Sequence, residues 1–424
     1  MAVAVRSVGE VCREARRASR TLASTPTSVK DAALEAIALA LEERMAEILR
    51  ANELDMQAGR EAEIGEALLD RLALDEGRVR AIAGAVRKIA ALGDPVGEVI
   101  DGHRLPNGLD VRKVRVPLGV VAVVYEARPN VTIDAAALCV KSGNAIVLRG
   151  SSTAAHSNEA LARIAAEAAV SAGLPEGSVS LVAGGGREEL AELATQRENV
   201  DLIIPRGGES LKEALQAVAT VPVIYAASGN CHVYVDAGAD LEMAERIVIN
   251  AKTQRPGVCN AAETLLVHAD AATEFVPRIA SALSAQGVLL RADPAALELA
   301  APVAGALAEP ASEEDFATEY LGPTLAVGIV DSVEEAIEHV GRYGSGHSEA
   351  IVTSDAASAR AFQLGVDAAC VYVNASTRFT DGGEFGMGAE IGNSTQKLHA
   401  RGPIGLRELC TFKYLVEGDG QIRA

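Results

Sequence analysis

Residues 119–150 read GVVAVVYEARPNVTIDAAALCVKSGNAIVLRG, and this stretch decides the fold class. The apolar run over 119–126 is typical of a strand that is buried on both faces. Residues 132–143 have the pattern of a helix that ends on a glycine, and 144–150 form a second apolar strand. This order of strand, helix and strand predicts two parallel strands joined by a right-handed crossover.

The same alternation continues along the chain in two α/β series, one ending near residue 226 and one running from about 233 to 375. Further strands are expected at 178–184, 200–208, 221–226, 263–269, 324–330, 349–354 and 369–376. Residues 1–92 carry apolar residues at helical spacing, whereas 284–318 are rich in Ala and Pro and predict no clear element. We therefore expect two Rossmann-like α/β domains with parallel sheets.

A hairpin is predicted over residues 99–116, where two extended segments flank Pro106-Asn107-Gly108. It fits either a local hairpin or a ribbon that pairs with another subunit. Residues 405–420 read GLRELCTFKYLVEGDG and predict one last exposed strand. Together these two segments predict a homo-oligomer built by sheet extension.

Composition excludes several classes of function. The chain has 424 residues, more than the ~250–300 at which a single core stops growing, so two or more domains are expected. A net charge of −19 repels phosphate backbones and anionic membranes, and aromatic residues, at 3%, are too few for base stacking. Six scattered cysteines without zinc spacing, a signal peptide or a long apolar run predict a cytoplasmic protein without a metal site.

Cys259 lies in KTQRPGVCNAAETLLVH, residues 252–268, on a turn that follows a helix. Lys252 and Arg255 beside the turn make the electropositive setting that lowers the pKa of a thiol. Local sequence alone leaves two readings open, an activated nucleophile or a buried structural cysteine. The second reading suits the cysteines that lie within apolar runs, namely Cys139, Cys370 and Cys410.

Several stretches resemble the γ-glutamyl phosphate reductases, a branch of the aldehyde dehydrogenase superfamily. They are 125–150, 200–208, 231–240, 254–268, 343–353 and 371–406. The resemblance implies an aldehyde-dehydrogenase-like fold with three parts. These are a dinucleotide-binding domain (1–98, 118–232 and 384–405), a catalytic domain (233–383), and an oligomerisation hairpin and strand (99–117 with 406–424).

In this family the nucleophilic cysteine corresponds to Cys259. Asn130 matches the asparagine that donates to the developing oxyanion, together with the backbone N–H of Cys259. From the residues alone, Asn130 would be read as an Asx turn after Pro129. The resemblance also places arginines in the matching motifs, where they could pair either with the substrate's anions or with ordinary acidic neighbours. They are Arg128, Arg255 and Arg378.

The sequence contains neither G-x-G-x-x-G after the first strand nor a G-x-x-x-x-G-K-[ST] loop. The resemblance implies a dinucleotide site on 147–152 and 205–210, at the end of a strand and the start of a helix. Its expected contacts are Arg149, Gly150, Ser151, Ser152, Gly207 and Gly208. An arginine and two hydroxyls without a nearby carboxylate favour NADP over NAD.

The resemblance implies that a Cys259 thioester forms from γ-glutamyl phosphate and is reduced by NADPH to glutamate 5-semialdehyde, the second step of proline biosynthesis. Hydrolytic relatives carry a glutamate where this chain has AASGN (226–230), so the thioester should survive. Glutamate 5-kinase is the expected donor of the substrate. The alternatives are a semialdehyde dehydrogenase for another acyl phosphate or acyl-CoA, and a non-catalytic oligomeric binding protein.

Overall fold

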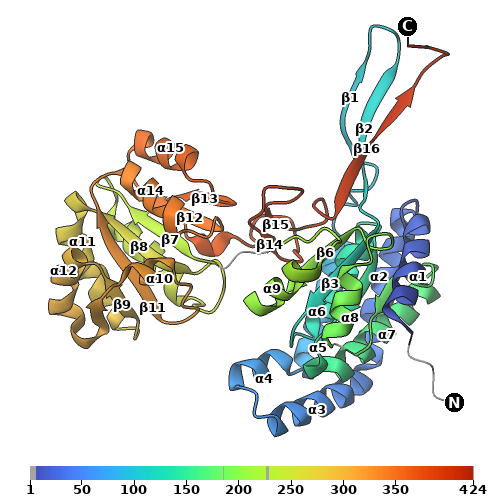
Figure 1. Ribbon diagram of the computed structural model, residues 1–424, viewed down its shortest axis with the longest axis horizontal. Helices are drawn as coiled ribbons and strands as arrows, with labels where there is room; N and C mark the ends of the chain where they lie inside the picture. Colours follow the sequence, from blue (N-terminus) through green and yellow to red (C-terminus); the bar gives the residue numbers. More distant parts are fainter. Residues whose placement is uncertain (1–5, 185, 226–228, 424) are drawn as a thin grey trace. The chain divides into compact units, whose positions relative to one another are not determined.

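The computed structural model describes residues 6–184, 186–225 and 229–423, and it divides into two compact units (Figure 1). The first unit comprises Met1–Tyr225, Gly386–Gly392 and Ile404–Ala424. The second unit comprises Ala226–Phe385 and Asn393–Pro403. Each unit is therefore assembled from stretches that lie far apart in the sequence.

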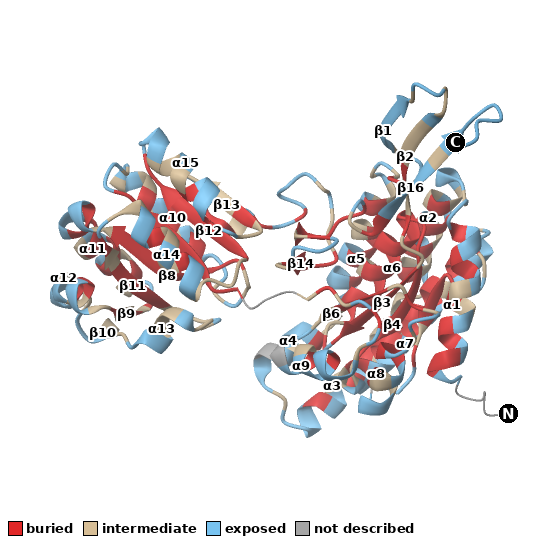
Figure 2. Cartoon of the chain, turned by 45° about the horizontal axis from the view of Figure 1, so that its top comes forward, coloured by how far each residue is buried: buried red, intermediate tan, exposed pale blue. Residues whose placement is uncertain are grey.

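A four-stranded parallel sheet with the order β5-β4-β3-β6 forms the centre of the first unit. Its strands are β3 (Val120–Tyr125), β4 (Ala145–Arg149), β5 (Val179–Leu181) and β6 (Leu202–Arg206). Every residue of β3 and β4 is buried, as Figure 2 shows, because helices cover the sheet. Helix α6 (Asn130–Lys141) joins β3 to β4, so the crossover predicted for 119–150 is confirmed.

Further helices pack around this sheet. They are α1 (Val8–Leu22), α2 (Thr27–Glu43), α3 (Met45–Glu61), α4 (Glu66–Leu72), α5 (Glu76–Ala90), the 3₁₀ turn η1 (Ser152–Ala154), α7 (Ala155–Ser171), α8 (Arg187–Ala194) and α9 (Glu209–Val218). The helical character predicted for residues 1–92 is confirmed in its described part. A membrane-spanning length of apolar helix does not occur among the described residues.

Helix α3 supports the start of α7, which follows the expected cofactor segment. The buried Asp55 carboxylate accepts hydrogen bonds from the backbone N–H groups of His156 (3.1 Å) and Ser157 (2.7 Å), and from the Ser157 hydroxyl (2.6 Å). These bonds satisfy N–H groups that the first turn of a helix leaves unpaired. The N-terminal helices therefore fix the direction in which the loop after β4 leaves the sheet.

The predicted hairpin and last strand are confirmed as one antiparallel sheet with the order β1-β2-β16. Its strands are β1 (Val99–Arg104), β2 (Asp110–Pro117) and β16 (Cys410–Glu417). Gly108 adopts φ = +90° in the turn between β1 and β2, a conformation that glycine reaches without steric cost. All residues of β1 are exposed, and an oligomerisation role for the sheet stays a prediction.

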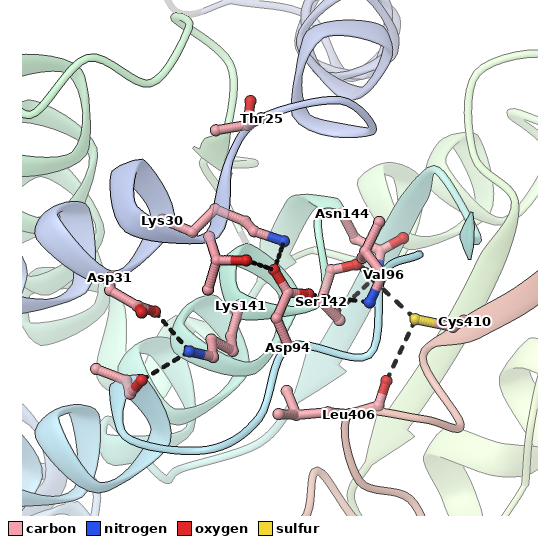
Figure 3. Close-up of polar contacts among 12 residues, drawn as sticks. Thr25, Lys30, Asp31, Asp94, Val96, Lys141, Ser142, Asn144, Leu406 and Cys410 are labelled. Atoms are coloured by element: carbon pink, nitrogen blue, oxygen red, sulfur yellow. Dashed lines mark hydrogen bonds and ion pairs between the residues drawn. The ribbon is translucent and has the colours of Figure 1, made fainter. Parts of the chain in front are cut away.

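A buried ion pair holds the segment that leads into β1 against the helices (Figure 3). The fully buried Lys30 ammonium of α2 lies 2.6 Å from the Asp94 carboxylate, which also accepts the Val96 N–H (3.0 Å). On the opposite edge, at the same end of the sheet, the buried Asn144 amide donates to the Leu409 carbonyl, directly before β16 (2.8 Å). Both approaches to the three-stranded sheet are therefore tied to the core of the first unit.

The second unit contains a seven-stranded parallel sheet with the order β10-β9-β11-β8-β7-β12-β13. Its strands are β7 (Cys231–Val235), β8 (Ala262–His268), β9 (Leu289–Ala292), β10 (Ala308–Pro310), β11 (Thr324–Val330), β12 (Ser348–Val352) and β13 (Cys370–Val373). Its helices are α10 (Leu241–Thr253), α11 (Ala269–Ser284), α12 (Pro294–Ala304), α13 (Glu313–Ala317), α14 (Val333–Tyr343) and α15 (Ala356–Gly365). Short elements complete it, namely η2 (Gly305–Leu307), η3 (Thr377–Phe379), β14 (Asn393–Ser394) and β15 (Gly402–Pro403).

The prediction of a strand over 221–226 is wrong for the part that the structure describes. Only Val223 makes a bridge there, to Ile203 of β6. Pro222 has no N–H to donate, so the segment cannot form a regular ladder with its neighbour. Residues 284–318, which predicted no clear element, contain β9, β10, α12 and α13.

Candidate active site

Cys259 lies on the turn between α10 and β8. Strand β8 is the central strand of the seven-stranded parallel sheet. It is half-buried, whereas the five other cysteines are buried. Gly229, before β7, packs directly against the Cys259 backbone: a Cβ atom there would lie 1.7 Å from the Cys259 carbonyl oxygen. Only glycine leaves room for this approach, so the backbone of Cys259 packs on Gly229.

The turn also brings two of the predicted arginines to the thiol. The Arg378 side chain donates from Nε to Gln254 (2.9 Å) and from Nη1 to Asn260, so it is held by residues on both sides of Cys259. Burial and the nearby Arg255 guanidinium lower the pKa of Arg378, whereas a charge on Cys259 raises it. Cys259, Arg255 and Arg378 therefore share one cationic environment in the second unit.

Lys252 does not contribute to this environment as the sequence suggested. Its ammonium and the Glu263 carboxylate are fully buried and form an ion pair at 2.5 Å. Burial raises the pKa of Glu263 to about 7, and burial also lowers the pKa of Lys252. The charge of Lys252 is therefore compensated inside the protein, and Arg255 is the cation that the turn carries.

A buried network contacts the backbone of the turn that carries Cys259. The Cys231 thiol at the start of β7 donates to the Cys259 carbonyl oxygen (3.2 Å). His347 lies 4.0 Å from the Cys231 sulfur through Nδ1, and the same nitrogen lies 2.8 Å from the Ser348 hydroxyl. Burial lowers the pKa of His347 to about 4, so its ring is neutral at physiological pH. His347 is therefore two contacts from the Cys259 backbone, through the Cys231 sulfur.

Asn130 and Arg128 belong to the first unit, at the β3–α6 connection. Asn130 is exposed and is the first residue of α6. Its amide donates to the Asp134 carboxylate at 2.9 Å, a side-chain bond one helical turn away in place of the Asx turn considered from the sequence. Burial raises the pKa of Asp134 to about 6, and the bond from Asn130 opposes that rise.

The expected cofactor segment opens onto a cavity of about 620 Å³ in the first unit. Gly150 and Ser151 after β4, Asn158 and Arg163 of α7, and the end of β5 line it. The buried polar atoms Ser151 Oγ and Asn158 Nδ2 have no hydrogen-bond partner among the described residues. Unpaired buried polar groups are costly and call for a polar ligand, so these residues fit the ribose and phosphate groups of a dinucleotide.

Of the other predicted cofactor contacts, Arg149 and Ser152 are chain neighbours of the lining residues Gly150 and Ser151, and Gly207 and Gly208 precede α9. Arg149 donates from Nη2 to the Gly186 carbonyl at 2.6 Å, and Ser152 is exposed. Gly208 precedes α9, and its N–H donates to the Glu126 carboxylate at 3.1 Å; a side chain on Gly207 would meet the same carboxylate. In this structure, therefore, a carboxylate of the chain itself caps the helix start that was predicted to bind phosphate.

Sequence comparison now assigns this arrangement to a family. The model of the aldehyde dehydrogenase family matches residues 2–296 and 307–413. The chain belongs to the aldehyde dehydrogenase family. The γ-glutamyl phosphate reductases of Heliobacterium modesticaldum and Moorella thermoacetica are 55% and 56% identical to it over 411 residues, which is 97% of each chain.

The crystal structure of γ-glutamyl phosphate reductase from Thermotoga maritima matches it with a TM-score of 0.95 and 46% identity, covering 99% of this chain and 100% of that one. The predicted resemblance and the aldehyde-dehydrogenase-like α/β fold are confirmed, and the chain is an oxidoreductase of that family. Membership implies a nicotinamide cofactor. The roles of the individual site residues stay predictions.

Sequence reasoning missed residues that only the fold brings to Cys259. Glu319 accepts the Gly229 N–H at 2.6 Å, and the side chain of Asn260 contacts Arg378. In the first unit, Asn158 of α7 was also missed; it lines the cavity with Gly150 and Ser151. Glu319 lies far along the chain from Cys259, so no local pattern indicates it. Asn260 was visible in the quoted motif, but its contacts were not.

Proposed function

We propose that the chain catalyses the NADPH-dependent reduction of L-glutamate 5-phosphate to L-glutamate 5-semialdehyde and phosphate, the second step of proline biosynthesis. The observation that carries the proposal is one half-buried thiol, Cys259, beside Arg255 and Arg378 on a turn that only Gly229 allows. The high identity to γ-glutamyl phosphate reductases over nearly the whole chain supports the choice of substrate.

The Cys259 thiolate attacks the carbonyl carbon of the acyl phosphate, and phosphate leaves as a thioester forms. The Asn130 carboxamide and the Cys259 N–H donate to the oxyanion of the tetrahedral intermediate. When bound, the nicotinamide cofactor supplies hydride for the thioester carbon. Glu263, four residues after the nucleophile, is buried against Lys252 and does not act as a base toward water. Three of the residues that correspond to the hydrolytic glutamate segment, 226–228, lie outside the described residues.

The substrate carries a phosphate and an α-carboxylate, and the cationic residues suit both groups. Arg255 and Arg378 bind one of these anions beside the thiol, and Arg128 at the β3–α6 connection binds the other. Guanidinium groups are well matched to such oxyanions because they donate two parallel N–H bonds.

NADP is the proposed form of the cofactor. Arg149, Gly150, Ser151 and Ser152 form its adenosine-side contacts, with Ser151 Oγ unpaired among the described residues and no carboxylate within 147–152. A cation with hydroxyl donors suits a 2′-phosphate, whereas a carboxylate at this place would suit a 2′-hydroxyl. The backbone of Gly207 and Gly208 at the start of α9 approaches the pyrophosphate.

The proposal includes a cytoplasmic homo-oligomer that receives its labile acyl phosphate from glutamate 5-kinase. Exposed apolar residues on the β1-β2-β16 sheet support self-association; they are Val99, Ile100, Phe412, Tyr414 and Val416. Sedimentation of the intact chain beside a variant with Phe412 and Tyr414 replaced by serine tests this part. A monomeric wild-type protein would contradict it.

The enzymatic test follows NADPH formation at 340 nm from glutamate 5-semialdehyde and NADP⁺, with and without phosphate. We expect phosphate-dependent turnover that is lost in Cys259→Ala and kept in the matched variant Cys12→Ala, whose cysteine is buried in α1. NAD⁺ in place of NADP⁺ should give a lower rate. Turnover without phosphate would indicate hydrolysis, and turnover with CoA in place of phosphate would indicate an acyl-CoA enzyme; either result contradicts the proposal.

A further inference from the structure

Asn260, the residue after Cys259, is 6% exposed and bonds to a segment 118 residues away. Its Nδ2 donates to the backbone carbonyls of Arg378 (3.3 Å) and Thr380 (3.0 Å). Its own backbone carbonyl accepts the Thr377 hydroxyl at 2.7 Å. These three bonds fix η3, the 3₁₀ turn that carries Arg378, against the catalytic turn.

The same side chain also holds the guanidinium itself. Asn260 Oδ1 accepts from Arg378 Nη1, and Gln254 Oε1 accepts from Nε at 2.9 Å. A guanidinium has five N–H groups, and these bonds occupy two of them among the described residues. Because both anchors flank Cys259 in the sequence, the direction of the guanidinium is set by the catalytic turn.

We propose that Asn260 is a positioning residue that aims Arg378 at the acyl substrate's anionic group beside the Cys259 sulfur. The inference rests on the proposed function for the identity of the substrate. It adds that Asn260, through Arg378, determines the selection of an anionic substrate. A neutral amide suits this role, because it accepts from the guanidinium without cancelling its charge. An aspartate at the same place would lose both donations and neutralise the cation.

The test uses the protein without substrate or cofactor. Cys259 is the cysteine that is not buried, so alkylation reports on its surroundings. Iodoacetate is an anion and iodoacetamide is neutral, so the ratio of their second-order rate constants measures the cationic field at the thiol. The variants are Asn260→Ala, the milder Asn260→Ser, Arg378→Gln, and Asn260→Ala with Arg378→Gln. Asn250→Ala is the matched control, since Asn250 is an exposed asparagine of α10.

We expect Arg378→Gln to lower the iodoacetate-to-iodoacetamide ratio roughly fivefold and Asn260→Ala to lower it roughly threefold. The ratio for Asn260→Ser should lie between those of Asn260→Ala and the wild type. The double variant should match Arg378→Gln, because Asn260 acts through the arginine. Asn250→Ala should keep the wild-type ratio. A purely structural role would slow both reagents equally and leave the ratio unchanged, and that outcome overturns the inference. Additive effects of Asn260→Ala and Arg378→Gln would also overturn it.

Two further results keep this inference apart from the proposed reaction. In the 340 nm assay Asn260→Ala should raise KM for glutamate 5-semialdehyde and phosphate more than it lowers kcat, since it misdirects a binding group. Failure of wild-type turnover with these substrates would remove the reductase assignment, while the alkylation ratio would still decide the role of Asn260.

Discussion

Replacing Gly229 by alanine should disable Cys259 without touching any polar group. The added Cβ would lie 1.7 Å from the carbonyl oxygen, 2.3 Å from the carbonyl carbon and 2.4 Å from the Cα of Cys259. Ordinary van der Waals contact begins at 3.4 Å, so the two backbones must separate by about 1.7 Å. All three atoms belong to the backbone, which cannot swing aside as a side chain does. Overpacking of this kind costs about 1–3 kcal/mol of stability.

The effect on turnover should be larger than the effect on stability. A displacement of ~1 Å at reacting groups costs about a hundredfold in rate, so kcat should fall at least about a hundredfold at saturating substrate. Iodoacetamide alkylation of Cys259 and thermal unfolding should be measured on the same preparation. Gly341→Ala is the matched control: its Cβ meets nothing within 4 Å in α14, and it should be neutral or slightly stabilising. Wild-type kcat and unfolding temperature in Gly229→Ala would refute the close approach.

Two further predictions concern buried ionisable groups. His347 has a pKa lowered by burial from 6.5 to about 4, so the unfolded chain takes up its proton first as pH falls. His347 should therefore contribute a decline of about 2 kcal/mol in stability between pH 7 and pH 5 in urea unfolding, and His347→Gln should remove that contribution; an unchanged pH profile in the variant would contradict this. Lys252→Met leaves the Glu263 carboxylate buried without its partner and should cost about 3–5 kcal/mol at pH 8. Adding Glu263→Gln should recover most of this loss, and a double variant as unstable as Lys252→Met would refute the pairing.

The sequence predicts the fold best where burial is complete. The strands predicted over 119–126 and 144–150 are continuous apolar runs. A strand that is covered on both faces needs apolar residues at nearly every position, so such a run indicates it directly. Prediction failed at the edges of sheets, where the deciding factor is hydrogen bonding. Residues 221–225 are apolar enough for a strand, yet Pro222 lacks the donor a ladder needs. Strand β10 is three residues long and ends on Pro310, too short for a periodic pattern.

The candidate site divides in the same way. Cys259 could be selected from its turn, its basic neighbour Arg255 and its motif, all of which are local. Gly229 and Asn260 could not be selected in this way, because their importance comes from contacts with residues 30 and 118 positions away. The packing of β7, β8 and η3 brings these partners together. The prediction that Lys252 makes the surroundings of the Cys259 thiol electropositive was wrong. Lys252 is close to Cys259 in the sequence, but its ammonium pairs with the buried Glu263 carboxylate.

The antiparallel sheet of β1, β2 and β16 has a consequence for the order in which the chain is made. Strand β2 ends at Pro117, and its partner β16 begins at Cys410. At usual translation rates of ~5–20 residues per second, one edge of β2 waits roughly 15–60 seconds on the ribosome before its partner exists. An open edge of that kind is a template for pairing with other nascent chains. Strand β2 carries three cations within four positions, namely Arg112, Lys113 and Arg115. Their charges repel other nascent chains during that interval.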